Sequence, residues 1–334
     1  MRIAVDIFGG DNAPLATLAG ARQAVKELGV EILAVGDISA MEKCCADNNI
    51  DTTGITFRQA DKVFCMEDDP QDIIKKRTDT SMHIALKAIA DGEGDALVSA
   101  GSTGALLMGA TFIVKRIKGC RRPALGGVLP GRNPGGFMLI DSGANAEVRP
   151  EMLAQFGLMG SVYMGKVGGR TRPRVALLNN GTEPTKGTEV HKAAYRLMSE
   201  RSDINFIGNI EGRDVMDDIA DVVVADGFSG NIALKVSEGV ANFMNQGIKD
   251  ILKTNLRTKI AALLIKNELK QFKAKLDYTE YGGVPVLGVR AGVIKAHGSS
   301  DRKAVKNAIR QAKIYAENDV SGLIARRLGR EEDK

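Results

Sequence analysis

Residues 222–235, VVVADGFSGNIALK, form the stretch around which the rest of the chain is organised. Its first half is a short β-branched run, which is typical of a strand buried on both faces of a parallel sheet. A glycine-rich turn then leads into an apolar, helix-like pattern. Glycines let the backbone approach a ligand closely, and the first N–H groups of a helix have no partner within it. The stretch has the outline of an anion site, although a single loop of this kind is more often an ordinary turn with a capped helix.

The composition indicates a soluble globular protein with one large α/β core. The chain has 334 residues, of which 44% are hydrophobic and 26% are charged, and this length also permits two domains. Aromatic residues make up only 4% and tryptophan is absent, which argues against a stacking surface for single-stranded nucleic acid. The net charge of +5 is too small for the dense basic face of a duplex binder, so no nucleic-acid partner is expected.

Cysteine usage predicts a cytoplasmic protein with reduced thiols. Positions 44, 45, 65 and 120 have neither CxxC spacing nor a neighbouring histidine cluster, so disulfides and a metal site are both poorly supported. Asp6 interrupts the first apolar run too early for the core of a signal peptide. The sequence contains no uninterrupted run of about 18 apolar residues, the length that a membrane-spanning helix needs.

Strand-like and helix-like segments alternate along the chain. This βαβ order predicts a parallel sheet with right-handed crossovers. Asp11 or Asn12 is expected to cap the helix that starts near Pro14, since proline suits the first turn. Strands are predicted at 3–8, 31–35, 95–99, 126–129, 137–140, 175–178, 204–207 and within 278–289, with the turn PGRNPGG at 130–136 joining one pair, and helices are predicted at 81–91, from 188 and at 302–318.

At least five of the predicted strands run into polar loops at positions where a helix should begin. In open α/β sheets, ligands bind beyond the carboxyl ends of the strands, at the point where the strand order reverses. The loops are therefore expected to converge on one cleft. They are GGDNAP (9–14), SAGSTGA (99–105), DSGAN (141–145), NNGTEPTKG (179–187), GNIEGRD (208–214) and the turn within 222–235.

Several well-known catalytic motifs are missing from these loops. GTEPTKGT places Lys186 before its glycine, the wrong order for a P-loop, and no GxGxxG is followed by an acid about 20 residues later. A GxSxG elbow is also missing, and His83 and His191 lie in helical segments, where histidine is more often structural. Neither a cofactor nor a metal is expected.

Residues 241–276 differ in character from the rest of the chain. Apolar residues from position 248 to 264 repeat at helical spacing, and lysines and arginines occupy the opposite side. This pattern predicts a protruding, basic, amphipathic helical segment. Three roles stay open for it: packing on its own sheet or on a dimer mate, lying on a membrane surface, and docking an acidic protein.

Eight ordered motifs resemble those of the phosphate acyltransferase family, the acyl-acyl-carrier-protein:phosphate acyltransferases. They are MRIAVDxxGGD, SAGxTGA, DxGAN, GTEPTKG, GNIEGRD, DGFSGN, YGGVPVLGV and AHGSS, and they extend from Met1 to about Asn318. The resemblance implies a three-layer α/β/α Rossmann-like fold, shared with phosphotransacetylases and isopropylmalate dehydrogenases. Residues 1–334 would then be a single catalytic domain with a helical protrusion at about 241–276.

The resemblance also implies a reaction and a set of partners. A fatty acyl-acyl-carrier protein and inorganic phosphate would give an acyl phosphate and free carrier, for phospholipid synthesis through phosphatidic acid. The implied protein is a cytoplasmic homodimer with weak peripheral contact at the inner face of the membrane, and a membrane glycerol-3-phosphate acyltransferase would act downstream. The chain departs from the family pattern at Asn12, usually histidine, at Ser102, usually asparagine, and after Leu178, where NNGTE stands for NIGEE.

Phosphate attack on a thioester requires a binding site for the dianion, hydrogen-bond donors for the developing oxyanion, a general acid for the thiolate, and exclusion of water. Lys186 is the candidate to neutralise phosphate or polarise the carbonyl. Asn231 would donate its side-chain amide to the oxyanion or cap a helix. His297 would protonate the thiolate or orient a neighbour. The residues offer no activated cysteine or serine, so direct attack without an acyl-enzyme is expected.

Other residues are expected to bind phosphate, substrate or partners. Arg213 is a second candidate cation or an ion-pair partner, and Asp226 would orient Lys186 or cap a helix. Further phosphate or substrate contacts are expected at Gly10, Asp11, Ser99, Gly101, Ser102, Thr103, Gly104, Asn145, Gly227, Ser229 and Gly230, and carrier or membrane contacts at Lys253, Leu256, Arg257, Ile260 and Leu264.

Three rival functions stay open. The first is a phosphotransacetylase that acts on short acyl-CoA. The second is a hydride-transferring dehydrogenase of the same fold, which the missing cofactor fingerprint disfavours. The third is a non-catalytic module that binds acyl-carrier protein or anionic lipid.

Overall fold

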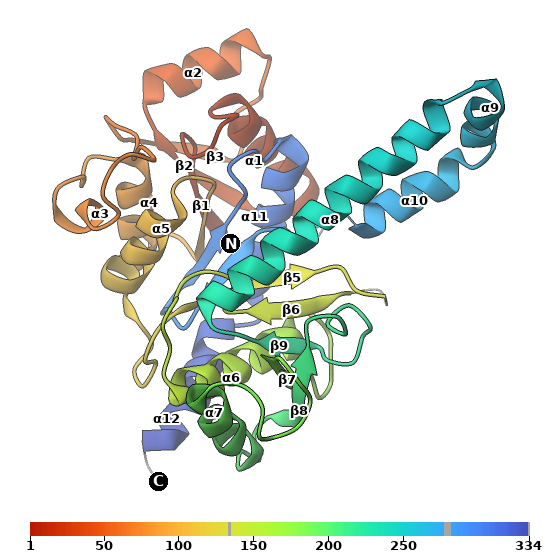
Figure 1. Ribbon diagram of the computed structural model, residues 1–334. Coiled ribbons are helices and arrows are strands. Elements are labelled where there is room, and N and C mark those ends of the chain that lie inside the picture. The colour runs from red at the N-terminus through yellow and green to blue at the C-terminus, as the bar shows by residue number, and fades with distance from the viewer. Residues whose placement is uncertain (133–134, 277–281, 333–334) are drawn as a thin grey trace.

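One large sheet organises the computed structural model, which describes residues 1–132, 135–276 and 282–332 (Figure 1). Within these residues the strand order is β3-β2-β1-β4-β11-β10-β5-β6-β9-β7-β8. Central strands are short buried runs of apolar residues, as expected for strands covered by helices on both faces. The strands are β1 (Arg2–Asp6), β2 (Glu31–Gly36), β3 (Ile55–Gln59), β4 (Ala96–Ser99), β5 (Ala124–Leu129), β6 (Phe137–Ile140), β7 (Arg174–Asn179), β8 (Asn205–Glu211), β9 (Val222–Val224), β10 (Val284–Leu287) and β11 (Gly292–Lys295).

The sheet consists of two parallel halves that run in opposite directions. Strands β3, β2, β1, β4 and β11 are parallel to one another, and so are β6, β9, β7 and β8. Between them, the pairs β11–β10, β10–β5 and β5–β6 are antiparallel. The mostly parallel sheet is confirmed. The carboxyl ends of the two halves point in opposite directions along the sheet, however, so the expectation that all the loops converge because they follow parallel strands is wrong.

Helices cover both faces of the sheet and confirm the three-layer architecture (Figure 1). Side chains of Asp37, Ser102, Thr188, Asp226 and Asp301 accept a backbone N–H at the starts of five of these helices, as N-caps do. The helices are α1 (Leu15–Leu28), α2 (Ile38–Asp47), α3 (Asp72–Lys75), α4 (Ser81–Ala90), α5 (Thr103–Gly109), the π-helical turn η1 (Ala110–Lys115), α6 (Pro150–Lys166), α7 (Glu189–Ser199), α8 (Gly227–Lys253), α9 (Leu256–Leu264), α10 (Lys266–Leu276), α11 (Arg302–Glu317) and α12 (Val320–Glu332).

The helix layer on one face has a gap above the centre of β5. The opposite face is covered by one continuous apolar cluster with α1, α6, α11 and α12. On the face with the gap, Leu125 belongs to a cluster beneath α4 and α5, and Leu129 belongs to another beneath the start of α8. Gly127 lies between them on the same face of the strand, because alternate residues of a strand point the same way. The gap is therefore bounded by α5 and α8 and has a residue without a side chain in its floor.

Helix α8 extends away from the sheet and carries α9 and α10 at its far end (Figure 1). The protruding segment is confirmed, although the expected boundary at 241 falls inside one continuous helix that no proline interrupts. Exposed apolar side chains recur every three or four positions along α8, at Phe228, Ile232, Val236, Val240 and Phe243. Among the described residues, no helix is both long enough and apolar enough to cross a membrane.

Some local expectations differ from the structure. Pro14 is the N-cap of α1 and makes no side-chain bond, so neither Asp11 nor Asn12 caps this helix. The amide of Asn12 instead donates to the carbonyl oxygen of Ser299 at 3.1 Å. Strand β8 continues to Glu211, so most of GNIEGRD is strand rather than loop. Strand β11 was not predicted, and residues 277–281 and 133–134, which include parts of YGGVPVLGV and PGRNPGG, lie outside the described residues.

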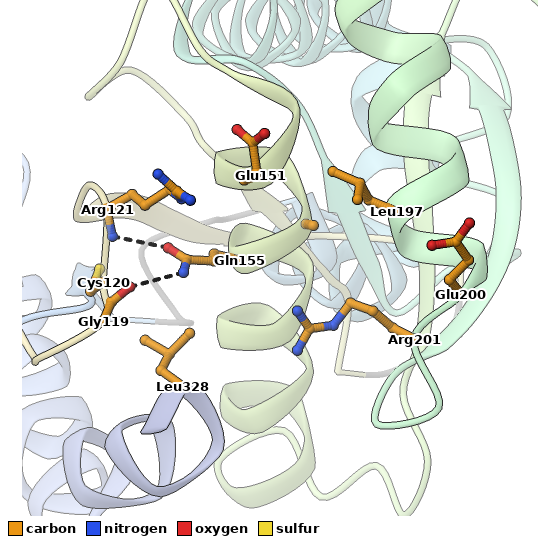
Figure 2. Close-up of a pocket in the computed structure, with 10 residues that line it drawn as sticks. Gly119, Cys120, Arg121, Glu151, Gln155, Leu197, Glu200, Arg201 and Leu328 are labelled. Atoms are coloured by element: carbon orange, nitrogen blue, oxygen red, sulfur yellow. Dashed lines mark hydrogen bonds between the residues drawn. The ribbon is translucent and has the colours of Figure 1, made fainter. Parts of the chain in front are cut away.

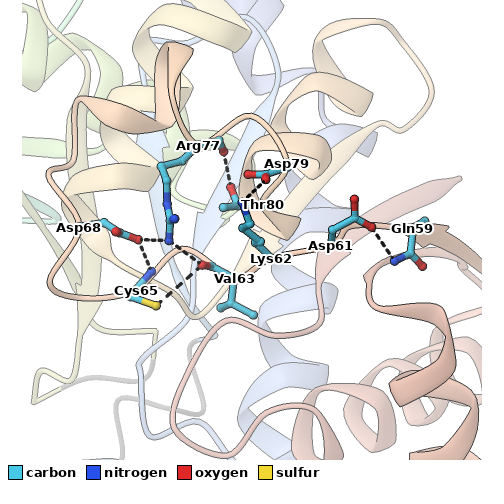
Figure 3. Close-up of polar contacts among 9 residues, drawn as sticks. All are labelled: Gln59, Asp61, Lys62, Val63, Cys65, Asp68, Arg77, Asp79 and Thr80. Atoms are coloured by element: carbon cyan, nitrogen blue, oxygen red, sulfur yellow. Dashed lines mark hydrogen bonds and ion pairs between the residues drawn. The ribbon is translucent and has the colours of Figure 1, made fainter.

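A polar surface segment that contains the short helix α3 joins β3 to α4 (Figure 3). Arg77 forms an ion pair with Asp68 at 2.7 Å, and the same carboxylate accepts the backbone N–H of Cys65 at 2.8 Å. Lys62 pairs with Asp79 at 2.8 Å beside them. These pairs fix the loop on the surface and leave Cys65 as an exposed free thiol.

Candidate functional site

The loops that follow β1, β4 and β11 form one unit at the carboxyl ends of three neighbouring strands. Gly10 lies between the other two loops: a Cβ atom there would be 2.9 Å from the Cβ of Ala100 and 2.9 Å from the carbonyl oxygen of Gly298. Its φ of +100° is a second reason why glycine is required. The N–H of Asp11 donates to the same carbonyl oxygen at 2.8 Å. Two of the predicted residues, Gly10 and Asp11, therefore hold loops together.

A buried carboxylate, Asp6, lies beneath this unit. It accepts hydrogen bonds from the hydroxyl of Ser81 at 2.6 Å and from that of Ser99 at 2.7 Å. Burial raises the pKa of Asp6, and these hydrogen bonds oppose the shift. The Ser99 hydroxyl also accepts the N–H of Gly101 at 3.1 Å. Ser99 and Gly101 thus connect the loop after β4 to the carboxylate below it.

Lys295, the last residue of β11, adds a buried ammonium group to the same unit. Its Nζ donates to the carbonyl oxygens of Ala100, at 3.3 Å, and of Ala296. Burial lowers the pKa of Lys295 to about 8, and the negative charges of Asp6 and Asp11 oppose the shift. Lys295 was not among the residues predicted from the sequence. The available signal was a short apolar run, GVIK, that ends in lysine directly before AHGSS.

The loops after β6 and β9 form a second unit. The buried carboxylate of Asp141 accepts the backbone N–H groups of Ala144 at 3.0 Å and Asn145 at 2.7 Å, and the side-chain amide of Asn145 at 2.8 Å. Burial raises the pKa of Asp141, and these donors oppose the shift. The carbonyl oxygen of Asn145 in turn accepts the N–H of Gly227 at 2.7 Å. Asn145 and Gly227 therefore connect DSGAN to the start of α8.

The first turns of α8 settle which residue caps that helix. Asp226 accepts the N–H of Ser229 at 2.8 Å and is the N-cap. Asn231 lies inside the helix, so the alternative that it is a cap is wrong. Its side chain is exposed on α8 beside Gly143, where an added Cβ would lie 3.6 Å from the side-chain oxygen Oδ1 of Asn231. The amide of Asn231 is therefore available to a ligand.

A cavity of about 220 Å³ occupies the gap between α5 and α8 and collects side chains from both loop units. Thr103, Asn231 and His297, all predicted from the sequence, line it together with Ser142 and Lys295. Loops from oppositely directed strands reach this space because α8 begins at the end of β9 and then passes in front of the central strands (Figure 1). The other lining residues are Leu125, Gly127, Val128, Leu129, Leu234, Lys235, Glu238, Gly282, Gly283, Val284, Ala296, Ser300 and Ala304.

His297 is held in one orientation by its own loop. Its Nδ1 accepts the backbone N–H of Ser299 at 3.2 Å and lies 2.9 Å from the Ser299 hydroxyl. Because Nδ1 accepts an N–H, the neutral ring carries its proton on Nε2. The ring can therefore donate a hydrogen bond to a ligand through Nε2. In this form it does not supply the expected acid, because loss of the Nε2 proton would leave an imidazolate.

Ser102 and Gly104 flank Thr103 without lining the cavity. The hydroxyl of Ser102 caps α5 by accepting the N–H of Ala105 at 3.5 Å. Gly104 packs against Pro70, to which an added Cβ would approach within 2.9 Å. Of the SAGSTGA residues expected to contact phosphate, Thr103 is the one that reaches the cavity.

Lys186 and Arg213 lie outside the residues that line the cavity. Lys186 is exposed in the loop after β7, which is separated from β6 by β9, and its backbone bonds to Glu183 and Asn179. Arg213 is also exposed and pairs with Glu211 at 2.8 Å, which agrees with the ion-pair alternative. The structure does not bring these two cations together with Asn231 and His297.

The residues expected to contact carrier or membrane lie at the far end of the α8 arm. Lys253 ends α8, and α9 holds Arg257. The apolar side chains of Leu256, Ile260 and Leu264 are 74%, 51% and 79% exposed, so the tip has an apolar surface. The tip is far from the cavity along the helix, since the two are separated by more than four turns of α8.

A larger hollow of about 650 Å³ lies elsewhere, between α6, α7 and the end of α12 (Figure 2). Arg121, Arg201, Glu151 and Glu200 contribute charges of both signs, and Gln155 is bound to the backbone of the neighbouring loop. Among the described residues that line this hollow, none was predicted from the sequence to belong to the site. The described residues also include no cluster of three or more histidine, cysteine or acidic side chains suited to a metal ion.

Comparison with known proteins gives a consistent result. A family described as "Fatty acid synthesis protein" matches residues 1–323. The phosphate acyltransferase of Bacillus subtilis (strain 168) is 45% identical over 327 residues, which cover 97% of each chain. The phosphate acyltransferase of Clostridioides difficile (strain 630) is 42% identical over 320 residues, covering 96% of this chain and 94% of the relative.

Solved structures agree on the fold. A phosphotransacetylase from Streptococcus pyogenes superposes with a TM-score of 0.65 at 16% identity, covering 95% of this chain and 94% of that chain. The EutD phosphotransacetylase from Staphylococcus aureus gives a TM-score of 0.62 at 16% identity, with 95% and 93% covered. At this identity the likeness shows the Rossmann-like fold alone.

Proposed function

The chain belongs to the fatty acid synthesis protein family, whose members include phosphate acyltransferases, and from this premise we propose that it transfers a fatty acyl group from acyl-acyl-carrier protein to inorganic phosphate. The product would be an acyl phosphate for phospholipid synthesis by way of phosphatidic acid. The observation that carries the proposal is the cavity between α5 and α8. It brings a hydroxyl, a side-chain amide and an imidazole, from Thr103, Asn231 and His297, to one space.

Phosphate is proposed to bind at the start of α5. Thr103 lines the cavity there, and the first N–H groups of a helix favour an anion. A phosphate oxygen attacks the thioester carbonyl carbon, the C–S bond breaks, and the sulfur leaves as a thiolate. The side-chain amide of Asn231 donates to the carbonyl oxygen as negative charge develops on it.

His297 is proposed to stabilise the leaving thiolate by a hydrogen bond. Its Nδ1 accepts the Ser299 N–H, so the neutral ring donates from Nε2 and keeps its proton. A full proton transfer is not required, because a thiolate leaves more readily than an alkoxide or an amine. Lys186 lies in the loop after β7, outside the cavity lining, and its ammonium group is proposed to attract phosphate from there.

Direct attack is favoured over an acyl-enzyme intermediate. A cysteine nucleophile must be a thiolate, and burial raises the pKa of Cys120 to about 11. Cys120 also lines the larger hollow rather than the cavity. The phosphate oxygen is then the nucleophile.

The α8 arm supports the partner proposals. A stripe of exposed apolar side chains along a single helix is a common sign of an interface, and we propose that it contacts the second copy of a homodimer. The basic, apolar tip formed by α9 is proposed to contact the acidic carrier or, weakly, the inner face of the membrane. A membrane glycerol-3-phosphate acyltransferase is the proposed consumer of the acyl phosphate.

The test is phosphate-dependent release of free thiol, compared for palmitoyl-carrier protein and acetyl-CoA. A fatty acyl-carrier preference supports the proposal. A preference for acetyl-CoA would instead support the short-chain phosphotransacetylase, which the solved neighbours make the second candidate. Binding of carrier without thiol release would indicate a non-catalytic module.

A further inference from the structure

We infer that Lys295 is a positioning residue of the proposed reaction, whose ammonium group ties the loop carrying Thr103 to the loop carrying His297. The inference rests on the proposed function for its kinetic readout. Its structural basis is independent of that function, because it consists of contacts within the chain.

The two hydrogen bonds of the Lys295 ammonium group reach both loops. Nζ donates to Ala100, three residues before Thr103, and to Ala296, the residue before His297. An ammonium group has three donors and no acceptor, and bonds from a charged donor are roughly twice as strong as neutral ones. One cation therefore connects the backbones of two loops that both contribute to the cavity.

Other contacts in the same unit also hold its loops together. Gly10 lies against both Ala100 and Gly298, and Asn12 donates to the carbonyl oxygen of Ser299. These contacts hold the loop after β1 against the other two. Lys295 supplies the positive charge of the unit, and its side chain joins the β4 loop to the β11 loop beside the backbone bond from the Ala296 N–H to the Ser99 carbonyl oxygen.

A further observation concerns the charges that surround Lys295. Asp6 lies beneath it on β1 and Asp11 lies in the loop after β1. His297 follows it on its own loop, and across the cavity α8 presents Lys235 and Glu238, which pair with each other at 2.9 Å. The two aspartates favour the charged form of Lys295, and burial disfavours it.

The expected pH dependence follows from this balance. The charged form makes the strong loop bonds, and the pKa of Lys295 is lowered to about 8. The turnover rate is therefore expected to be at its full value below that pH and to fall as the pH rises through it. In Lys295→Met this alkaline decline should be absent, because the titrating group has been removed.

The experiment compares wild type with Lys295→Met and Lys295→Gln, using Lys43→Met on the exposed surface of α2 as a charge-matched control. For Lys295→Met, kcat should fall about 10- to 100-fold, while both KM values stay within about threefold, because misplaced groups act on the transition state. Lys295→Gln keeps a neutral NH2 group, with two N–H donors in place of three charged ones, and should recover part of kcat. Lys43→Met should match wild type.

A spectroscopic measurement separates positioning from a general loss of structure. The chain has three histidines, so their ring proton resonances can be assigned by substitution. In Lys295→Met the His297 resonance should move, while those of His83 and His191 should not. If Lys295→Met does not fold, the same comparison is made with Lys295→Gln.

Several outcomes would overturn the inference. They are an unchanged kcat, an unmoved His297 resonance, or a rise confined to the KM for phosphate, which would make Lys295 a phosphate ligand. If wild type releases no thiol from any acyl donor, the proposed function fails instead, and the histidine spectrum still tests the role of Lys295.

Discussion

The carbonyl oxygen of Asp141 occupies the space in which a side chain at position 230 would begin. A Cβ added to Gly230 would lie 1.9 Å from that oxygen. The obstacle is a backbone atom between β6 and the DSGAN loop, so it cannot rotate away as a side chain would. The first turn of α8 can therefore approach DSGAN only because residue 230 is glycine.

Gly230→Ala is expected to lower the free energy of unfolding by about 3 kcal/mol, since the loop or the helix must shift to relieve the overlap. Urea unfolding followed by circular dichroism measures this. The control is Gly239→Ala on the same helix, where a Cβ would meet nothing within 4 Å. That change should stabilise the chain by about 0.5–1 kcal/mol, since alanine is the better helix former. Equal effects of the two substitutions would contradict the close approach.

Asn231→Ala is expected to reduce kcat about 100-fold with little change in either KM, because an oxyanion donor acts mainly in the transition state. Initial rates of thiol release measure the change. Asn242→Ala provides a matched control, since it makes the same substitution at an exposed position further along α8. Loss of phosphate affinity without loss of kcat would assign Asn231 to substrate binding instead.

Lys186→Ala tests the exposed cation in the loop after β7. We expect kcat/KM for phosphate to fall about 10-fold, because a positive charge that attracts the dianion through solvent is removed. Lys192→Ala on α7 removes a half-buried charge that pairs with Glu189 and should leave the rate unaltered. If Lys186→Ala and Lys192→Ala behave alike, Lys186 takes no part in the reaction.

The double charge reversal Lys253→Glu/Arg257→Glu tests the tip of the arm. It should raise the KM for acyl-carrier protein about 10-fold and weaken binding to anionic vesicles, because basic residues there attract acidic surfaces. Turnover of short acyl-CoA should change less, since the tip is far from the cavity. Lys43→Glu on α2 is the control for net charge. An equal loss of turnover with acyl-carrier protein and with short acyl-CoA would argue against a docking role.

Local chemistry was predictable from the sequence, and residues 222–235 illustrate why. The β-branched run became β9, Asp226 became the N-cap of α8, and the side chain of Asn231 lies at the cavity. Each of these outcomes depends on a residue and its near neighbours, through strand propensity, capping and helical spacing. Thr103 and His297 were found in the same way, from loops at strand ends.

Long-range pairing was not predictable in this way. Strand β11 has only four residues, and its partner β4 lies almost 200 residues earlier, so nothing local marks it as a central strand. Lys295 was overlooked because its burial depends on that pairing, whereas Lys186 lies in a conspicuous loop. The opposite directions of the two half-sheets likewise depend on β5 and β10, whose antiparallel pairing is a tertiary property.

The network around Asp221 gives a prediction about stability and pH. Its buried carboxylate accepts two hydrogen bonds from the Arg174 guanidinium, at 3.1 and 3.2 Å, and lies 3.4 Å from that of Arg170. Burial alone would raise the pKa of Asp221, but Arg174 and Arg170 outweigh burial and hold the pKa below its usual value of 3.8. A carboxyl group whose pKa is lowered by folding stabilises the fold above the pKa of the unfolded chain. That contribution is lost as the pH falls through the lower, folded value.

Asp221→Asn should therefore lower the free energy of unfolding by about 3 kcal/mol at pH 7, because two guanidinium groups lose a largely buried partner. The difference in free energy of unfolding between wild type and variant should become smaller below pH 3.8, where the wild-type carboxyl group begins to take up a proton. Urea unfolding at pH 7 and pH 3 measures both effects. Asp217→Asn is the control, because its partner Arg132 is 75% exposed and such surface pairs contribute little. An equal difference in free energy of unfolding at both pH values would show that Asp221 acts through packing rather than through its charge.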